Sequence, residues 1–301
     1  MNAIELCILA AIWGASFLFM RVGAAELGPV PLVALRVLIA VIALSPALRS
    51  QAVRHQLRTH IKPLFIVGMT NSTLPFCLLT YATLYVSAGV DSILNATTPL
   101  WTAVIAYCWL GIPINKMQRL GMSIGFLGVV TLTWDAVGMG RPGSMLAVVA
   151  ALCATLCYGF SVNYSKRNLV GVDPIVSVIG SQFCSVLVLM PFAFGMWPSG
   201  KISMSTWYAV LALGILCTAV AYILYFRLIA RVGASYAASV TFLIPVFGVL
   251  WGHLFLAEQI NHLTGISCLI IVAGTLLGSG KIPAPRFLST VSKPQKDASA
   301  G

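Results

Sequence analysis

Residues 4–25 read IELCILAAIWGASFLFMRVGAA, an apolar run whose only charged residues are Glu5 and Arg21. A helix rises about 1.5 Å per residue, so about 20 such residues cross a hydrocarbon core of about 30 Å. No basic segment precedes the run, and its flank holds no small-residue cleavage pattern. We therefore expect a retained membrane-spanning helix and not a signal peptide.

Nine similar runs follow, and the whole composition agrees with them. The chain is 59% hydrophobic and 8% charged, with a mean hydropathy of +0.96, whereas soluble domains are about 25% charged. The sequence therefore predicts an all-α integral membrane protein with ten transmembrane helices. The expected spans are 4–25, 31–48, 64–86, 90–111, 119–136, 144–164, 174–195, 206–227, 235–256 and 262–280.

The charged residues give the expected orientation. The net charge of +11 comes from cations gathered in alternate links, which favours contact with membrane lipid and not with nucleic acid. Because cytoplasmic loops carry the excess of Lys and Arg, both termini are expected in the cytoplasm of a bacterial cell with the protein in its inner membrane. The basic links hold Arg49, Arg54, Arg58, Lys62, Lys116, Arg119, Lys166, Arg167, Arg227 and Arg231.

The two halves of the chain resemble each other at a spacing of about 145 residues. Trp13-Gly14 aligns with Tyr158-Gly159, Gly28-Pro29 with Asp173-Pro174, and, after a shift of one residue, Pro99 with Pro245. Five helices per half is an odd number, so the second copy enters the membrane from the opposite side, as in many secondary transporters. The predicted division is a repeat at 1–136, a linker at 137–143, an inverted repeat at 144–280 and a disordered cytoplasmic tail at 281–301.

Two motifs carry a family resemblance. The segments WGASFLFMRVG at 13–23 and IPVFGVLWGHLFLAEQINHLTGISCLIIVAG at 244–274 resemble EamA-type members of the drug/metabolite transporter superfamily. Within that superfamily the chain looks most like the YddG-type exporters of aromatic amino acids. The resemblance implies a ten-helix inverted-repeat carrier with a central cavity that works by alternating access. It departs at Glu258, whose position in the first half is Ile112.

Polar residues inside the fourth expected span are candidates for the substrate path. Asp91, Asn95, Thr98 and Thr102 form a stripe on one helix face, and Asn95 is nearest to mid-span. The alternative is that these groups hydrogen-bond neighbouring helices. Pro99 and its counterpart Pro245 predict paired helix interruptions, which in transporters point to the central site; simple packing kinks are the alternative.

Aromatic residues deeper than the interfacial belt could surround an apolar or aromatic ligand, although ordinary core packing would also place them there. Asn163 could act in gating or cap its helix beside Lys166. The complete set of candidate substrate-binding residues is Trp13, Phe17, Tyr81, Asn95, Pro99, Trp101, Tyr158, Asn163, Tyr222 and Pro245.

Two cations lie within expected spans. Arg21, near the outer end of the first, is expected to extend to the lipid headgroups. Arg36 lies inside the second, where we expect it to pair with Glu26 or Asp91. The alternative is that Arg36 attracts the carboxylate of a substrate.

The sequence shows no catalytic grouping, zinc-ligand run or nucleotide-binding loop, so no enzyme, metal or cofactor is predicted. The predicted function is export of small amphipathic metabolites, above all aromatic or other neutral amino acids. The expected partners are a small-molecule substrate and membrane lipid, and no oligomer is required. The alternatives are a drug, cation or nucleotide-sugar carrier of the same superfamily, and, further off, a membrane enzyme or receptor.

Overall fold

The computed structural model describes residues 2–138, 142–259 and 261–279, and within these ranges all regular elements are helices. The predicted tail at 281–301 lies outside the described residues, as does the centre of the predicted linker. The first part of the chain forms α1 (Asn2–Leu27), α2 (Pro29–Leu44), α3 (Gln51–Thr59), α4 (Ile61–Gly68), α5 (Leu74–Ala82), α6 (Ala88–Asn95), α7 (Thr98–Leu110) and α8 (Lys116–Gly138). The second forms α9 (Ser144–Asn168), α10 (Pro174–Gly195), α11 (Met204–Leu211), α12 (Ala221–Val232), α13 (Ala234–Ala237), α14 (Val240–Leu256) and α15 (His262–Gly278).

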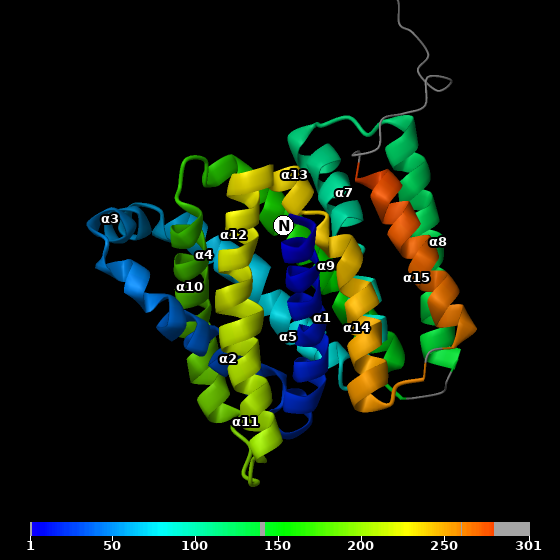
Figure 1. Ribbon diagram of the computed structural model, residues 1–301, viewed down its shortest axis with the longest axis horizontal. Helices are drawn as coiled ribbons and strands as arrows, with labels where there is room; N and C mark the ends of the chain where they lie inside the picture. The colour runs from blue at the N-terminus through cyan, green and yellow to red at the C-terminus, as the bar shows by residue number, and fades with distance from the viewer. Residues whose placement is uncertain (1, 139–141, 260, 280–301) are drawn as a thin grey trace, which may run out of the picture.

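Some of these helices join into longer runs. A 3-10 turn at Ser45–Arg49 continues α2, a π-helical segment at Met69–Thr73 joins α4 to α5, and another at Ala212–Val220 joins α11 to α12. In Figure 1 the runs stand side by side, with α13 at one end of the molecule and α11 at the other. Short α3 lies at the edge, in a basic link between two expected spans.

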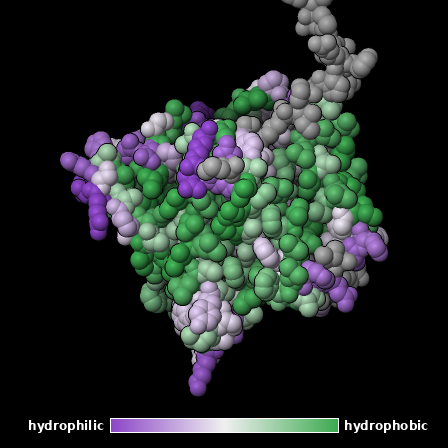
Figure 2. Space-filling view, in the orientation of Figure 1, coloured by the Kyte–Doolittle hydropathy of each residue, from purple (hydrophilic) through white to green (hydrophobic). Residues whose placement is uncertain are grey.

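The chain is a multi-pass membrane protein. Seven helical runs in the described residues are long and apolar enough to cross a membrane: Asn2–Leu27, Pro29–Arg49, Ile61–Ala82, Ala88–Leu110, Ser144–Asn168, Pro174–Gly195 and Met204–Val232. The shorter apolar helices α14 and α15 lie where the last two spans were expected. Figure 2 shows hydrophobic residues over the middle of the visible face and hydrophilic ones toward its ends, as a lipid-facing surface requires.

Turn residues set several helix ends at positions about 145 apart. α2 and α10 both begin with a proline at their first position, which suits a helix start because the missing N–H would have no partner there. Asp173 caps α10, its side chain accepting a hydrogen bond from the Ile175 N–H at 2.8 Å. α7 and α14 both end in a left-handed residue, Gly111 and Ala257.

The predicted interruption at Pro99 lies just after the break between α6 and α7, but the one at Pro245 is wrong because α14 runs through that proline. The second half breaks earlier, between α13 and α14. After each break a threonine hydroxyl donates to the carbonyl three residues back. Thr98 donates to the Asn95 oxygen at 2.8 Å and Thr241 to the Ala238 oxygen at 2.9 Å.

Glycines let the two parts of the chain approach closely. A Cβ on Gly14 of α1 would collide with Phe247 and Gly248 of α14, and a Cβ on Gly159 of α9 would collide with the backbone of Trp101 and Thr102 in α7. α8 and α15 also pack glycine against glycine. Such small residues are typical of helix interfaces in membranes, where close backbone contact replaces the hydrophobic effect.

Candidate functional site

A cavity of about 710 Å³ lies between helices of both parts of the chain. It extends from Arg36 in the middle of α2 to Lys166, Pro174 and Ala234, which lie where α9 ends and where α10 and α13 begin. Half of the candidate residues line it. They are Trp13, Phe17, Asn95, Tyr158 and Tyr222.

The other candidates lie outside the lining that the described residues form. Tyr81 packs on Tyr85, with ring centroids 5.0 Å apart, and Trp101 meets the edge of Phe126 at 5.3 Å. Asn163 is buried and its amide donates to the Thr102 oxygen at 3.0 Å, which joins α9 to α7. The remaining two candidates outside the lining are Pro99 and Pro245.

One wall of the cavity is aromatic. The Trp13 ring lies 5.3 Å from that of Tyr225 and 6.2 Å from that of Tyr222, which stacks on Phe226. Aromatic pairs at these separations attract each other beyond the area they bury. The wall therefore presents flat apolar faces together with phenol groups, which suits a ligand with an aromatic or otherwise apolar part.

The cavity also contains residues that were not predicted. Asn71 donates to the Tyr222 hydroxyl at 3.3 Å, and Phe76 lies nearby in α5. Asn71 belongs to the π-helical segment, where the sequence reads TNST inside an apolar run. That polar interruption was a usable signal, because polar groups inside a span face a cavity or another helix.

Arg36 is the buried cation of the lining, with 4% of its surface exposed. Its Nε donates to the Thr218 hydroxyl at 3.0 Å, and its Cζ lies 3.8 Å from the centre of the Phe76 ring. The expected pairing with Glu26 or Asp91 is wrong. Glu26 accepts from the Ser203 N–H at 2.7 Å at the far end of α1, and the structure pairs Arg36 with no carboxylate among the described residues.

Thr218 belongs to the π-helical segment at Ala212–Val220. Its hydroxyl donates to the Leu213 oxygen, five residues back, at 2.8 Å, and accepts from Arg36. The wide turn of the π-helix therefore positions the Thr218 hydroxyl, which in turn orients the Arg36 guanidinium.

Two acceptors in α6 have no hydrogen-bond partner among the described residues. Asp91 is fully buried and neither carboxylate oxygen is paired, and one turn later Asn95 has an unpaired amide oxygen. Positions four apart share a helix face, and Asn95 lines the cavity. An unpaired buried acceptor is costly, so a donor supplied by a ligand or water would be stabilised at Asn95.

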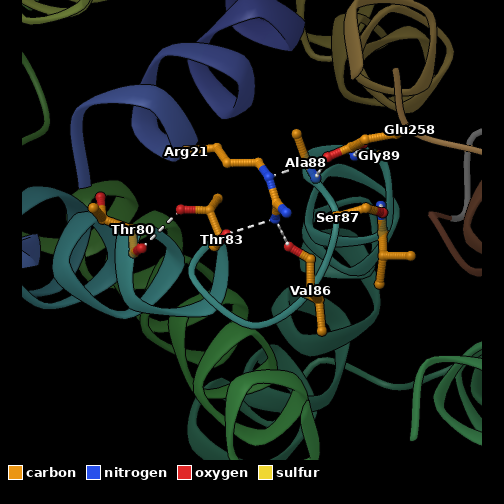
Figure 3. A network of polar contacts seen from close by, with 9 residues as sticks. Arg21, Thr80, Thr83, Val86, Ser87, Ala88, Gly89 and Glu258 are labelled. Atoms are coloured by element: carbon orange, nitrogen blue, oxygen red, sulfur yellow. Dashed lines mark hydrogen bonds and ion pairs between the residues drawn. The ribbon is translucent and has the colours of Figure 1, made fainter. Parts of the chain in front are cut away.

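A polar network lies around the turn between α5 and α6 (Figure 3). Arg21 does not extend to the headgroups as expected. Its Nη1 donates to the backbone oxygens of Thr83 and Val86 at 2.8 and 2.5 Å, and its Nε lies 3.5 Å from a carboxylate oxygen of Glu258. These two carbonyls belong to the turn between α5 and α6, where no backbone N–H of the described residues donates to them. They are therefore free to accept hydrogen bonds from the Arg21 guanidinium.

Glu258 also binds the start of α6. Its two carboxylate oxygens accept from the N–H groups of Ala88 at 2.8 Å and Gly89 at 3.2 Å. The first N–H groups of a helix lack internal partners and favour negative charge. Glu258, which follows α14, therefore joins α14, α6 and α1 at one point.

Comparisons with known proteins agree with this arrangement. The model of the EamA-like transporter family matches two segments, residues 2–134 and 145–279. YvbV of Bacillus subtilis (strain 168), described as an uncharacterized transporter, is 28% identical over 313 residues, covering 100% of this chain and 95% of YvbV. YedA of Escherichia coli (strain K12), described as an uncharacterized inner membrane transporter, is 24% identical over 274 residues, covering 89% of this chain and 87% of YedA.

A solved crystal structure of a protein has a similar fold. It superposes with a TM-score of 0.64 at 18% sequence identity, covering 92% of this chain and 96% of the other. At this identity the likeness concerns the fold alone.

Proposed function

The chain belongs to the EamA-like transporter family, and from this premise we propose that it exports small amphipathic metabolites, aromatic amino acids in particular, through the cavity beside Trp13. The observation that carries the proposal is the composition of that cavity. Aromatic rings form one wall, while Asn71, Asn95 and Arg36 supply polar groups. Amphipathic solutes need both kinds of surface.

The proposal includes ten spans arranged as two inverted repeats, divided at 1–136 and 144–280. Besides the seven long runs, α8, α14 and α15 would complete the set. Two contacts support the repeat. Gly14 packs on Phe247 as Gly159 packs on Trp101, and each residue of the first pair lies 145 or 146 positions from its counterpart in the other. The family model also matches in two segments of similar length.

We propose that this conformation is open toward the end of the bundle that carries the Lys- and Arg-rich links. The cavity reaches Lys166 at that end, whereas the Arg21–Glu258 network joins three helices at the other. Because the positive-inside rule assigns basic loops to the cytoplasm, we propose that both termini lie on the cytoplasmic side of a bacterial inner membrane. Transport would then require the network to open while the cavity closes around Lys166.

A cationic drug is a weaker candidate substrate. The described lining contains Arg36 and Lys166 and no Asp or Glu. A cation would be repelled by Arg36 at close range inside the membrane, where charge interactions are strong. A nucleotide sugar, which carries several negative charges, would favour more interior cations than these.

Transport by the purified chain in liposomes tests the proposal. Vesicles loaded with radiolabelled phenylalanine, tryptophan, leucine or a cationic dye are diluted into buffer, and release is compared with protein-free vesicles. We expect faster release of the aromatic amino acids, slowed in Trp13→Ala. Trp134→Ala is the matched control, because Trp134 is exposed outside the cavity. Release of the dye alone would contradict the proposal.

A further inference from the structure

We propose that Arg36 is the binding residue for a substrate carboxylate, so that the carrier selects monocarboxylates, free amino acids among them, over amides, esters and amines of the same shape. This rests on the proposed function, because it assigns the substrate class of the same cavity. Arg36 carries a charge that no carboxylate of the described residues neutralises.

An arginine stays protonated in proteins, so a positive charge lies inside the bundle at the middle of α2. About seven residues separate it from Pro29, which corresponds to roughly 10 Å along the helix axis. A buried charge is strongly destabilising unless it is paired. Within the described ranges the ion pairs are those of Arg21, Arg227 and Arg231, and none involves Arg36.

The contacts that Arg36 does make leave a defined part of it available. Thr218 occupies Nε at 3.0 Å, and the thioether of Met20 lies 3.7 Å from Nη1. Phe76 covers one face of the guanidinium plane. Both donors of Nη2 have no hydrogen-bond partner among the described residues. Neutral groups thus hold Arg36 in orientation. The edge of its guanidinium that carries Nη2 has no negatively charged partner among the described residues, and Arg36 lines the cavity.

A carboxylate fits that edge. The planar guanidinium donates to two oxygens of one carboxylate, and such charge-assisted pairs are among the strongest hydrogen bonds in proteins. The cavity favours a single negative charge, because the other cation of the described lining, Lys166, is exposed at the cavity end. Phenol and indole groups around Arg36 would face the apolar remainder of the ligand.

The opposite pole of an amino acid also has an acceptor available. Asn95 lines the same cavity and its buried amide oxygen has no hydrogen-bond partner among the described residues, while the unpaired carboxylate of Asp91 lies one turn away along α6. An ammonium group donates and does not accept. It would satisfy Asn95 without disturbing Arg36. The carboxylate is the required group in this arrangement, and the ammonium adds to it.

Binding measurements with the purified full chain test the assignment. The probes are 3-phenylpropanoate, phenylalanine and phenylalaninamide, and the readout is the dissociation constant from calorimetric titration. We expect the wild-type protein to bind the two carboxylates about 10- to 100-fold more tightly than the amide, as a charge-assisted hydrogen bond predicts. This comparison needs no variant, so a folding defect cannot obscure it.

Variants then assign the preference to Arg36. Arg36→Gln should lose about 10- to 100-fold in affinity for both carboxylates and little for the amide. Arg36→Lys keeps the charge without the two-pronged geometry and should fall between them. Arg58→Gln, which removes an exposed arginine outside the described lining, is the matched control and should bind as the wild type does. If Arg36→Gln does not fold, Thr218→Val serves as the second variant. It removes the hydrogen-bond partner of the Arg36 Nε and should weaken carboxylate binding.

The outcomes separate this inference from the proposed function. Equal binding of acid and amide by the wild type, or unchanged carboxylate binding by a folded Arg36→Gln, overturns the carboxylate site even if vesicles release aromatic amino acids. Arg36-dependent binding of 3-phenylpropanoate by a protein that releases no aromatic amino acid supports the site and overturns the proposed substrate.

Discussion

Glu258 lies 3.5 Å from the guanidinium of Arg21, although 237 positions separate the two residues in the chain. Neither residue lines the described part of the cavity that contains Trp13 and Arg36. The pair instead connects the far end of α1 to the residue after α14, while Glu258 also holds the first N–H groups of α6. The network therefore joins α1, α6 and the residue after α14, at the end that we propose to be closed.

Replacing Glu258 should loosen that end. Glu258→Ala leaves the Ala88 and Gly89 N–H groups without their acceptor, so we expect a loss of about 1–3 kcal/mol in the free energy of unfolding. Glu258→Gln keeps one acceptor oxygen and should lose less. Thermal unfolding of detergent-purified protein measures both. The matched control, Gln259→Ala, truncates the exposed side chain that follows Glu258 and should leave the melting temperature unchanged; a similar fall there would argue against the network.

Gly252 allows Glu258 to reach α6, because a Cβ at this position would collide with the Glu258 carboxylate. We expect Gly252→Ala to displace that carboxylate and to lower stability as Glu258→Ala does. The double variant should be less destabilised than the sum of the two, since neighbours that share one interaction are not additive. Unfolding free energies of the four proteins in the cycle measure this, and full additivity would show that the glycine acts by packing alone.

The close contact of α1 with α14 depends on Gly14. Gly14→Ala should lower stability by about 1–3 kcal/mol, the usual cost of overpacking, because its Cβ would lie against Phe247 and the Gly248 backbone. Gly159→Ala should behave alike at α9 and α7. Gly195→Ala is the control, because a Cβ there meets nothing within 4 Å. Melting temperatures that fall equally in all three variants would contradict the packing argument.

Ala257 has a φ of 52°, in the left-handed region that favours glycine, and the corresponding Gly111 has a φ of 65°. Ala257→Gly should raise the free energy of unfolding by up to about 1 kcal/mol by removing this strain. Gly111→Ala should lower it. The two thermal shifts should have opposite signs, and equal signs would exclude backbone strain as their cause.

Sequence reasoning located the helical runs well because the membrane thickness sets their length. The run at 4–25 and the proline starts at Pro29 and Pro174 are local signals that no distant contact overrides. The predicted interruption at Pro245 was wrong because a membrane helix can continue past a proline when the freed carbonyl finds another partner. A threonine follows each break, and the hydroxyls of Thr98 and Thr241 donate to the backbone carbonyls three residues back.

The cavity was less predictable because its walls come from distant parts of the chain. The partner of Arg36 is Thr218, 182 positions away, so no local pattern could choose it over Asp91. Tyr81 and Phe76 lie on the same helix, yet Phe76 lines the cavity and Tyr81 does not. Which face of an apolar helix turns inward depends on its neighbours, and helices apolar all round give no sign of it.

The π-helical segment at Ala212–Val220 has a mechanical consequence for the cavity. A π-helix holds one extra residue per turn, so its conversion to a regular α-helix would rotate the following residues by about 100°. Thr218 would then turn away from Arg36 and release the guanidinium. The hydrogen bond from Arg36 to Thr218 thus links the winding of a helix in the second half of the chain to the orientation of a buried cation in the first half.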